Sequence, residues 1–151
     1  MLPKTDLTEA FWQTFANSAG AQNVDNVVVT LGDSSSMAAH LAELVVRVTK
    51  RVTCSLVRDC LQSPENFPKV DGFVVVLDGN DQPRRIWRTT EVEVKPLIAV
   101  DDQFALDKGQ GNRSRAWWLD AHRNHFGQQA VRYGFEMRDE IPCVFERFEV
   151  V

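Results

Sequence analysis

The chain has 151 residues, 44% of them hydrophobic and 25% charged, which is the size and balance of one globular domain. This composition excludes a disordered, collagen-like or coiled-coil chain, and no apolar run reaches the 18 residues that a membrane span needs. The net charge of −4 argues against a protein that covers duplex DNA with aligned lysines and arginines.

The N-terminal residues and the cysteines indicate a compartment. The segment Met1–Asp6 lacks the charged and then apolar pattern of a signal peptide, so we expect a cytoplasmic protein. The three cysteines, Cys54, Cys60 and Cys143, are odd in number and have no CxxC spacing. We therefore expect reduced thiols and no zinc site.

The first half of the chain alternates helix and strand patterns. Asp6–Asn17 is predicted to be a helix, with Asp6 as its N-cap and Glu9 completing a capping box. A short β-branched run, Val27–Leu31, predicts a strand. Ser34–Val48 predicts a second helix, because serines precede an apolar face with helical spacing.

The middle of the chain is predicted to be mostly strands. Residues 49–57 are rich in β-branched side chains, and residues 62–72 contain the prolines of a loop. Phe73–Asp78 is a continuous apolar strand. Asp78–Asp81 then has the composition of a hairpin turn, in which Gly and Asn tolerate positive φ. Its partner strand, residues 85–95, would place Ile86, Val92 and Val94 on one face.

The last third adds a helical region and a closing strand. We expect a short helix over residues 101–106, a glycine-rich loop over 108–112, and a helix from Arg113 or Ser114 to about Phe126. Cys143–Val151 is predicted to be a final strand. No repeat or linker divides residues 1–151, so the sequence predicts one α+β domain. A small mixed barrel of five or six strands with flanking helices would leave few sheet edges exposed.

A basic stretch at the end of the second helix is the strongest chemical feature. Residues 47–58 contain four cations and no acid, with Thr49, Thr53 and Ser55 interleaved. Lys50 at this turn could project into a cleft, where ammonium and hydroxyl groups bind phosphate or a polarised carbonyl. The alternative is that these cations only complement the helix dipole.

Two further segments combine features of ligand sites. The loop 108–114 precedes a helix and could present backbone N–H groups to an anion, or it could be a flexible connector. Arginines accompany Trp117 in residues 113–118 and Trp87 in residues 84–88, a combination that stacks single-stranded bases. These tryptophans could equally be packing residues, and residues 84–88 a solvated edge strand.

A metal or local catalytic signature is not recognisable. His122 and His125 are three residues apart near Asp120, but the sequence offers no third ligand, and HExxH and GxSxG are absent. We therefore expect no metal and no cofactor.

The spaced motifs resemble the ASCH domain family over nearly the whole chain. They are Leu31–Ser34, Ala42–Val45 leading into Lys50–Thr53, Val76–Gly79, Arg88–Val92, Ser114–His122 and Ile141–Val150. The resemblance implies a PUA-like β-barrel with helices around a cleft, and binding of RNA or a modified nucleoside. Some members of the family are ribonucleases, or amidohydrolases that act on acetylated cytidine.

The resemblance also implies site residues. In the amidohydrolase type a Lys-x-x-Thr motif acts with a later Glu, and the motif corresponds here to Lys50 and Thr53. Gln110 stands where an acidic residue is expected, and an amide cannot titrate. If the protein is an enzyme, ribonuclease action is therefore favoured over amide hydrolysis, unless Asp102 or Asp107 replaces the missing carboxylate.

These observations give one leading hypothesis and two alternatives. The leading one is a cytosolic module that binds RNA or a nucleoside. If the module is also an enzyme, we expect a weak ribonuclease whose catalytic residues are Lys50 and Thr53. We expect the ligand to be bound by Arg51, Ser55, Gln110, Arg113, Ser114, Trp117 and Trp87. The alternatives are an amidohydrolase of an acylated nucleoside and a protein-interaction module with a vestigial cleft. No hypothesis involves a membrane.

Overall fold

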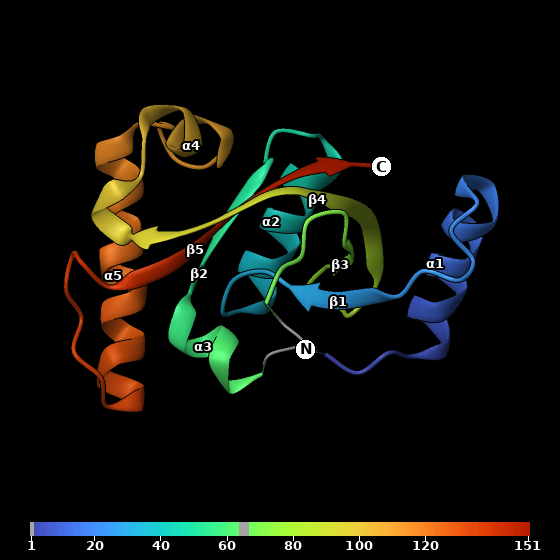
Figure 1. Ribbon diagram of the computed structural model, residues 1–151, viewed down its shortest axis with the longest axis horizontal. Helices are drawn as coiled ribbons and strands as arrows, with labels where there is room; N and C mark the ends of the chain where they lie inside the picture. Colours follow the sequence, from blue (N-terminus) through green and yellow to red (C-terminus); the bar gives the residue numbers. More distant parts are fainter. Residues whose placement is uncertain (1, 64–66) are drawn as a thin grey trace.

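The computed structural model describes residues 2–63 and 67–151, which form an α+β fold around one curled sheet (Figure 1). The helices are α1 (Asp6–Ala19), α2 (Ser35–Val46), α3 (Val57–Gln62), the 3-10 helix η2 (Leu97–Ala99), α4 (Asp102–Asp107) and α5 (Arg115–Tyr133). The strands are β1 (Asn26–Thr30), β2 (Val52–Leu56), β3 (Phe73–Leu77), β4 (Pro83–Pro96) and β5 (Pro142–Val150). Across the described ranges, no helix is long and apolar enough to cross a membrane.

The sheet has the strand order β1-β3-β4-β5-β2. β1 runs parallel to β3, whereas the other neighbouring pairs are antiparallel. The long strand β4 pairs with β3 through its first half and with β5 through its second half, so the sheet curls around it. The predicted α+β class and the barrel-like sheet with flanking helices are confirmed, in the form of a five-stranded half-barrel whose edges are β1 and β2.

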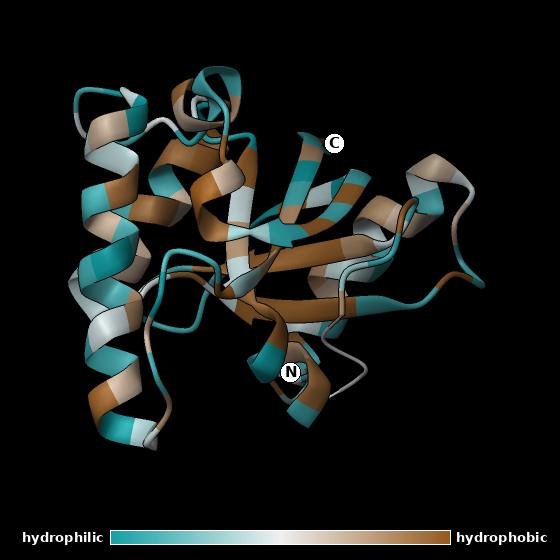
Figure 2. Cartoon of the chain, turned by 60° about the vertical axis from the view of Figure 1, so that its left-hand side comes forward, coloured by the Kyte–Doolittle hydropathy of each residue, from teal (hydrophilic) through white to brown (hydrophobic). Residues whose placement is uncertain are grey.

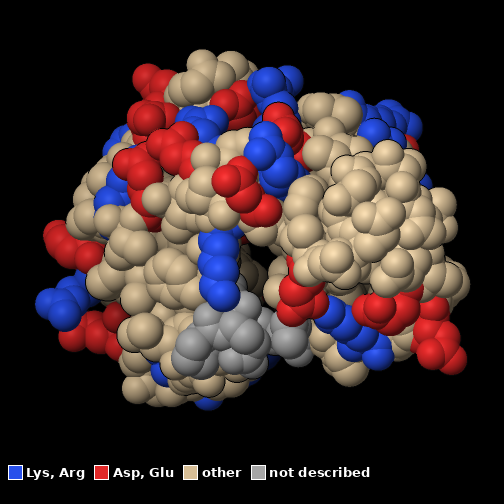
Figure 3. All heavy atoms as spheres, turned by 45° about the vertical axis from the view of Figure 1, so that its right-hand side comes forward, with Lys and Arg blue, Asp and Glu red and all other residues tan. Residues whose placement is uncertain are grey.

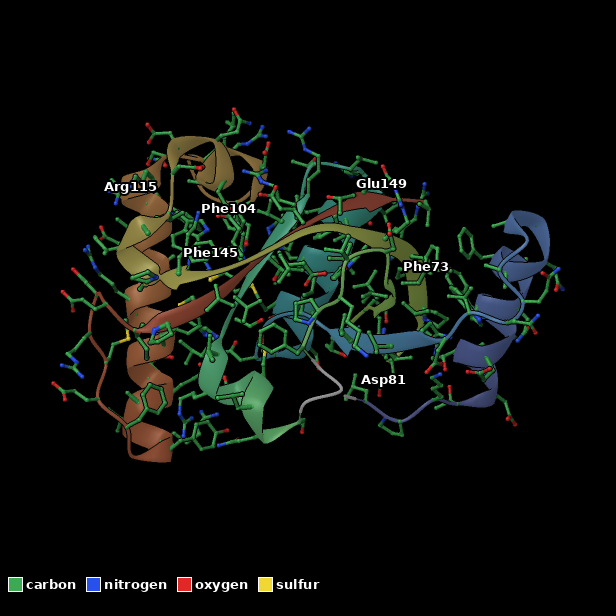
Figure 4. All side chains as sticks on the ribbon, in the orientation of Figure 1. Phe73, Asp81, Phe104, Arg115, Phe145 and Glu149 are labelled. Carbon is green, nitrogen blue, oxygen red and sulfur yellow. The ribbon has the colours of Figure 1, made fainter. Side chains whose placement is uncertain are left out.

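Helices cover both faces of the sheet, and Figure 2 shows mainly hydrophobic strands at its centre and helices of mixed hydropathy around them. α1 packs on β1 and β3 through Trp12 and Phe15, which contact Phe73. α4 and α5 pack on β2 and β5, where Phe104 and Phe145 meet with ring centroids 5.0 Å apart (Figure 4). The half-barrel therefore has its hydrophobic core in separate layers.

The helix predictions are right in type and differ at the ends. α1 is capped by Thr5, whose hydroxyl accepts from the backbone N–H of Thr8, so Asp6 lies inside the helix rather than at its N-cap. α5 continues to Tyr133, well beyond the predicted end, because Gly134 is the residue that adopts the left-handed terminating conformation. α3 was not predicted. It begins where the β-branched pattern of β2 ends.

The strand β4 departs from the predicted alternation. Ile86 and Trp87 are neighbours, yet both are buried because helices cover both faces of the sheet at this point. The register then shifts between Thr89 and Glu91, and Val94 becomes exposed. A single alternating face over residues 85–95 is therefore wrong. The predicted loop 62–72 lies partly outside the described residues, at positions 64–66.

The hairpin between β3 and β4 is confirmed, for a different local reason than predicted. Asp81 adopts the positive φ of 59° in this turn, whereas Gly79 does not. Gly79 is needed because a Cβ atom at this position would collide with the backbone carbonyl of Ser35 at the start of α2. The glycine thus lets the hairpin approach the helix.

Candidate functional site

A cavity of about 370 Å³ lies between the loop after β1, α2, the edge strand β2, the loop after α4, and α5. These elements meet beside β2, one of the two edges of the half-barrel. Its lining residues are Leu31, Gly32, Asp33, Met37, Leu41, Lys50, Thr53, Cys54, Lys108, Gln110, Trp117, Ala121, His122, Asn124, His125 and Gln128. The cavity therefore joins residues from most of the chain.

Lys50 forms part of the floor because of how α2 ends. Val48 has a positive φ of 60°, and the backbone N–H groups of Thr49 and Lys50 both donate to the carbonyl of Leu44. This tight turn directs the Lys50 side chain inward, where none of its surface is exposed. Its Nζ donates to the backbone carbonyl of Val52 at 2.6 Å.

Lys108 lies beside Lys50 and comes from the end of α4. It is followed by Gly109, whose φ of 74° and close approach to the carbonyl of Thr49 leave no room for a Cβ atom. The preceding Asp107 fixes this loop through Arg51 at 2.5 Å and Arg147 at 2.8 Å. Lys108 is therefore held in the cavity, with 8% of its surface exposed.

Within residues 2–63 and 67–151, Lys4 and Lys95 form ion pairs, whereas the two buried lysines do not. Burial lowers the pKa of Lys50 well below its ordinary value, and the neighbouring Lys108 lowers it further. Burial also lowers the pKa of Lys108. Since two adjacent ammonium groups repel in a medium of low polarity, we assign the neutral amine to Lys50 and the charge to Lys108.

Glu146 is a buried carboxylate on β5, the strand that pairs with β2. Thr53 of β2 lies directly opposite Glu146 of β5. Burial raises the pKa of Glu146, while its Oε2 accepts hydrogen bonds from Trp87 Nε1 at 3.1 Å and Thr89 Oγ1 at 2.7 Å. The carboxylate is thereby held among core side chains, and Glu146 does not line the cavity.

One wall of the cavity is an aromatic and amide-rich face of α5. The ring of His122 stacks on Trp118 at 3.8 Å, and its Nδ1 lies 2.8 Å from the carbonyl of Trp118. Burial, with the nearby charge of Lys108, lowers the pKa of His122 to about 2, so the imidazole is neutral and donates this hydrogen bond. Asn124 and Gln128 present amide groups on the same helix.

Trp117 is a half-buried aromatic side chain lining the cavity. Its indole packs against Gly111, where an added Cβ atom would overlap the ring, and Gly111 has a φ of 59°. Gln110, in the same loop, also lines the cavity. Asp33 and His125 approach to 3.8 Å on another part of the lining.

The structure brings four of the predicted site residues together. Lys50, Thr53, Gln110 and Trp117 line the same cavity, although they come from three separate parts of the chain. Sequence reasoning did not assign Lys108 to the site. The signal was present, because Lys108 begins the glycine-rich loop that also carries Gln110.

Three other predicted ligand-binding residues lie away from the cavity lining. Arg51 turns outward and binds Asp107. Ser55 is exposed on β2. Trp87 is buried in the core and stacks on Phe148 with ring centroids 4.0 Å apart, because helices cover both faces of β4 at this position. Its indole is thus not available as an exposed stacking face.

The remaining predicted residues have structural partners around the cavity. Arg113 donates from Nε to the carbonyl of Leu106 at 3.0 Å, and Ser114 caps α5 by accepting from the N–H of Trp117. Asp102 is exposed in the first turn of α4. Asp107 is committed to arginines. Neither aspartate lines the cavity to replace the carboxylate that Gln110 lacks.

The face of the molecule in Figure 3 carries charges of both signs. On the face in Figure 3, acidic and basic side chains intermingle, without a continuous basic stripe. Among residues 2–63 and 67–151, no group of three or more His, Cys, Asp or Glu side chains is arranged to hold a metal ion.

Comparisons with known proteins identify the fold and the family. The structure is similar to that of the ASCH domain from Lactobacillus crispatus JV V101, with a TM-score of 0.89, 27% identity and coverage of 99% of this chain and 97% of that one. It is also similar to protein EF3133 from Enterococcus faecalis V583, with a TM-score of 0.84, 32% identity and coverage of 95% and 86%. No curated protein matches. Because the family model of the ASCH domain matches residues 27–151, the chain belongs to the ASCH domain family.

Proposed function

We propose that the cavity binds one nucleotide unit of single-stranded RNA or a modified nucleoside. The observation that carries this proposal is the combination of a cationic, hydrogen-bonding floor with a half-exposed tryptophan in one cavity of about 370 Å³. This volume lies in the range of about 300–1,000 Å³ that is typical of small-molecule sites. A duplex would need a long basic surface instead.

The lining suits an unpaired base. Trp117 offers a face on which a base can stack, an interaction of about 1–3 kcal/mol per base. The amides of Gln110, Asn124 and Gln128 each combine donors with an acceptor, as the polar edge of a base does. Aromatic stacking and amide hydrogen bonds together distinguish a nucleobase from a simple anion.

The two lysines could also support weak RNA cleavage. A neutral Lys50 amine accepts the proton of a ribose 2′-OH, whose oxygen then forms the new bond to phosphorus. The bond between phosphorus and the 5′-oxygen breaks, the 5′-oxygen takes up a proton from water, and a 2′,3′-cyclic phosphate remains. Lys50 then returns its proton to the solvent. Lys108 stabilises the additional negative charge on the phosphate as the bond to phosphorus forms.

Amide hydrolysis of an acylated nucleoside is a second candidate, favoured by the presence of Lys50 and Thr53 in one cavity. Thr53 would be the nucleophile and Lys50 its base. The leaving amine also needs a proton from an acid. Gln110 cannot supply it because an amide does not titrate, and the carboxylate of Glu146 is engaged by Trp87 and Thr89. We expect this reaction to be slow or absent.

Binding measurements on a short single-stranded RNA and on cytidine test the leading proposal. We expect binding to both, with RNA affinity falling as salt rises, and an affinity loss of about 5–150-fold in Trp117→Ala. Ser55→Ala, an exposed position outside the cavity, is the matched control. Absence of binding to both ligands by the folded protein would refute the proposal.

An activity assay separates the two reactions. The protein is incubated with RNA, and separately with acetylcytidine, and the cyclic phosphate ends and released acetate are measured. Acetate release that Thr53→Ala abolishes would support the amidohydrolase. Cyclic phosphate formation that survives Thr53→Ala but is lost in Lys50→Met would support the ribonuclease.

A further inference from the structure

We infer that Lys50 and Lys108 together form a receptor for one phosphate-type oxyanion, and that the pair takes up one proton when the anion binds. The inference deepens the proposed function and rests on it in one respect, that the anion is the phosphate of the bound nucleotide. Lys108 contacts the anion, and Lys50 lies next to Lys108 and responds to the added charge.

The geometry gives the two amines different roles. Lys50 is fully buried and its Nζ is held by the carbonyl of Val52 at 2.6 Å, so it is the more enclosed and more restrained of the two amines. Lys108 keeps part of its surface exposed and lines the same cavity. The hydroxyl of Thr53 and the amide of Gln110 line the same cavity and are further donors of the kind that an oxyanion requires.

The groups facing the pair offset its charge only in part. Glu146 from β5 raises the pKa of Lys50, but burial and Lys108 lower it more, and the Glu146 carboxylate is engaged by Trp87 and Thr89. The thiol of Cys54 from β2 stays protonated because burial raises its pKa. His122 from α5 is neutral. Asp33, from the loop after β1, is the carboxylate of the lining, and its neighbour there is His125 at 3.8 Å.

Anion binding changes which protonation state is favoured. In the empty cavity the two adjacent amines share a buried site, and one of them stays neutral because a second ammonium would be repelled. A phosphate monoester carries about two negative charges and three acceptor oxygens above its second pKa of about 6. Such a dianion attracts both amines in their protonated form, so the second proton comes from solvent. The phosphodiester of RNA carries one charge, which Lys108 balances, so Lys50 stays neutral with that ligand.

Calorimetry of cytidine 5′-monophosphate binding tests this inference. It is performed in buffers of different ionisation enthalpy between pH 7.5 and 9, where the charge of the phosphate is constant. We expect uptake of about one proton per ligand and an affinity that falls about tenfold per pH unit. Unphosphorylated cytidine should bind at least about tenfold more weakly, without proton uptake, and sulfate should compete with the monophosphate.

Three variants separate the receptor from general effects on folding. Lys108→Met should remove both the proton uptake and the advantage of the monophosphate over cytidine. Lys50→Met should remove the proton uptake. Lys69→Met, at an exposed surface lysine, should change neither. Circular dichroism verifies folding, and proton uptake that persists in either folded cavity variant overturns the inference.

The outcomes also distinguish this inference from the proposed function. Proton-coupled binding of sulfate and of the monophosphate, with no contribution from the base, would support the receptor and refute nucleotide recognition. Equal affinity for cytidine and its monophosphate would refute the receptor and leave nucleoside recognition standing. Binding of the monophosphate without proton uptake would also refute the lysine-pair receptor.

Discussion

The Nζ of Lys50 donates to the backbone carbonyl of Val52, two residues further along the chain, at 2.6 Å inside the protein. This short-range hydrogen bond holds a fully buried amine in place as the chain passes from α2 into β2. Because a single neutral carbonyl does not compensate a buried charge, the bond fixes the position of the amine without keeping it protonated.

Lys50→Met is expected to change the pH dependence of stability. The pKa of Lys50 is lowered in the folded state, so between that value and the unfolded value of about 10.4 the unfolded chain binds one more proton. Stability of the wild type therefore rises with pH through this window, by about 1.4 kcal/mol per pH unit. At pH 7 the wild type therefore loses stability, because its Lys50 must give up a proton when the chain folds. Lys50→Met has no such proton to lose and should be more stable than the wild type at pH 7.

Urea unfolding at pH 7, 8, 9 and 10 measures this effect. In Lys50→Met the carbonyl of Val52 loses its hydrogen-bond donor. This loss reduces the expected increase in the free energy of unfolding at pH 7 by about 1 kcal/mol. Lys69→Met is the control, since this exposed lysine should leave the pH profile unchanged. Parallel profiles for Lys50→Met and the wild type would show that the amine is charged in the folded protein.

His122 is expected to make the fold sensitive to acid. Its pKa is about 2 in the folded protein against 6.5 ordinarily, so the unfolded chain gains a proton below about pH 6.5 that the folded chain does not. Stability is therefore lost as the pH falls from about 6.5 towards 2, by about 1.4 kcal/mol per pH unit. His122→Phe should flatten this loss, because Phe keeps an aromatic ring against Trp118.

The acid effect is measured as the unfolding midpoint between pH 7 and 4. His40→Asn, at an exposed position of α2, should follow the wild-type profile. If His122→Phe loses stability with acid as steeply as the wild type, His122 is not the residue that titrates.

Gly111→Ala is expected to disturb the stacking face. The added methyl group would overlap the Trp117 ring, and the positive φ of Gly111 disfavours alanine. We expect a loss of about 1–3 kcal/mol in stability and at least a fivefold loss in cytidine affinity, since the ring has to move. Gly127→Ala is the matched control: it lies within α5 with free space around it and should stabilise by about 0.5–1 kcal/mol.

Thermal unfolding and cytidine titration of both glycine variants provide the measurement. The two substitutions add the same methyl group, so a difference between them comes from the site rather than from the chemistry. Unchanged cytidine affinity in Gly111→Ala would mean that the position of Trp117 does not matter for binding.

Asp107→Asn is expected to loosen the loop that carries Lys108. Burial alone would raise the pKa of Asp107, but hydrogen bonds from Arg147 and Gln103 and the charge of Arg51 lower it. Its contribution to stability is therefore present at neutral pH and is lost as the pH falls through its folded pKa, below 3.8. We expect a loss of about 1–3 kcal/mol at pH 7, because the buried carboxylate loses charged hydrogen bonds. Solvent screening of the partly exposed arginines keeps the loss within this range.

Chemical unfolding at pH 7 and pH 3 checks this prediction. The difference between Asp107→Asn and the wild type should shrink at the lower pH, as the wild-type carboxylate approaches protonation. Asp59→Asn, which removes a more exposed partner of Arg58, should cost less than about 1 kcal/mol. A constant difference across this pH range would contradict the ion-pair explanation.

Helices and strands of this protein could be predicted where neighbouring residues in the sequence determine where they begin. The serines before α2 and Asp101 before α4 mark helix starts, and the apolar run of β3 marks a strand. The predicted alternation of buried and exposed residues failed where helices pack on both faces of a strand. Ile86 and Trp87 are both buried, although neighbouring strand residues point to opposite faces.

The sequence by itself determined the α+β class and the resemblance to the ASCH domain, and it singled out Lys50 as a candidate, because these depend on residue type and spacing along the chain. Only the tertiary structure decided that Lys108 lies beside Lys50 and that Trp87 belongs to the core while Trp117 lines the cavity. The physical reason is that burial and charge proximity, which set the protonation of both amines, arise when α4 and α5 pack against β2.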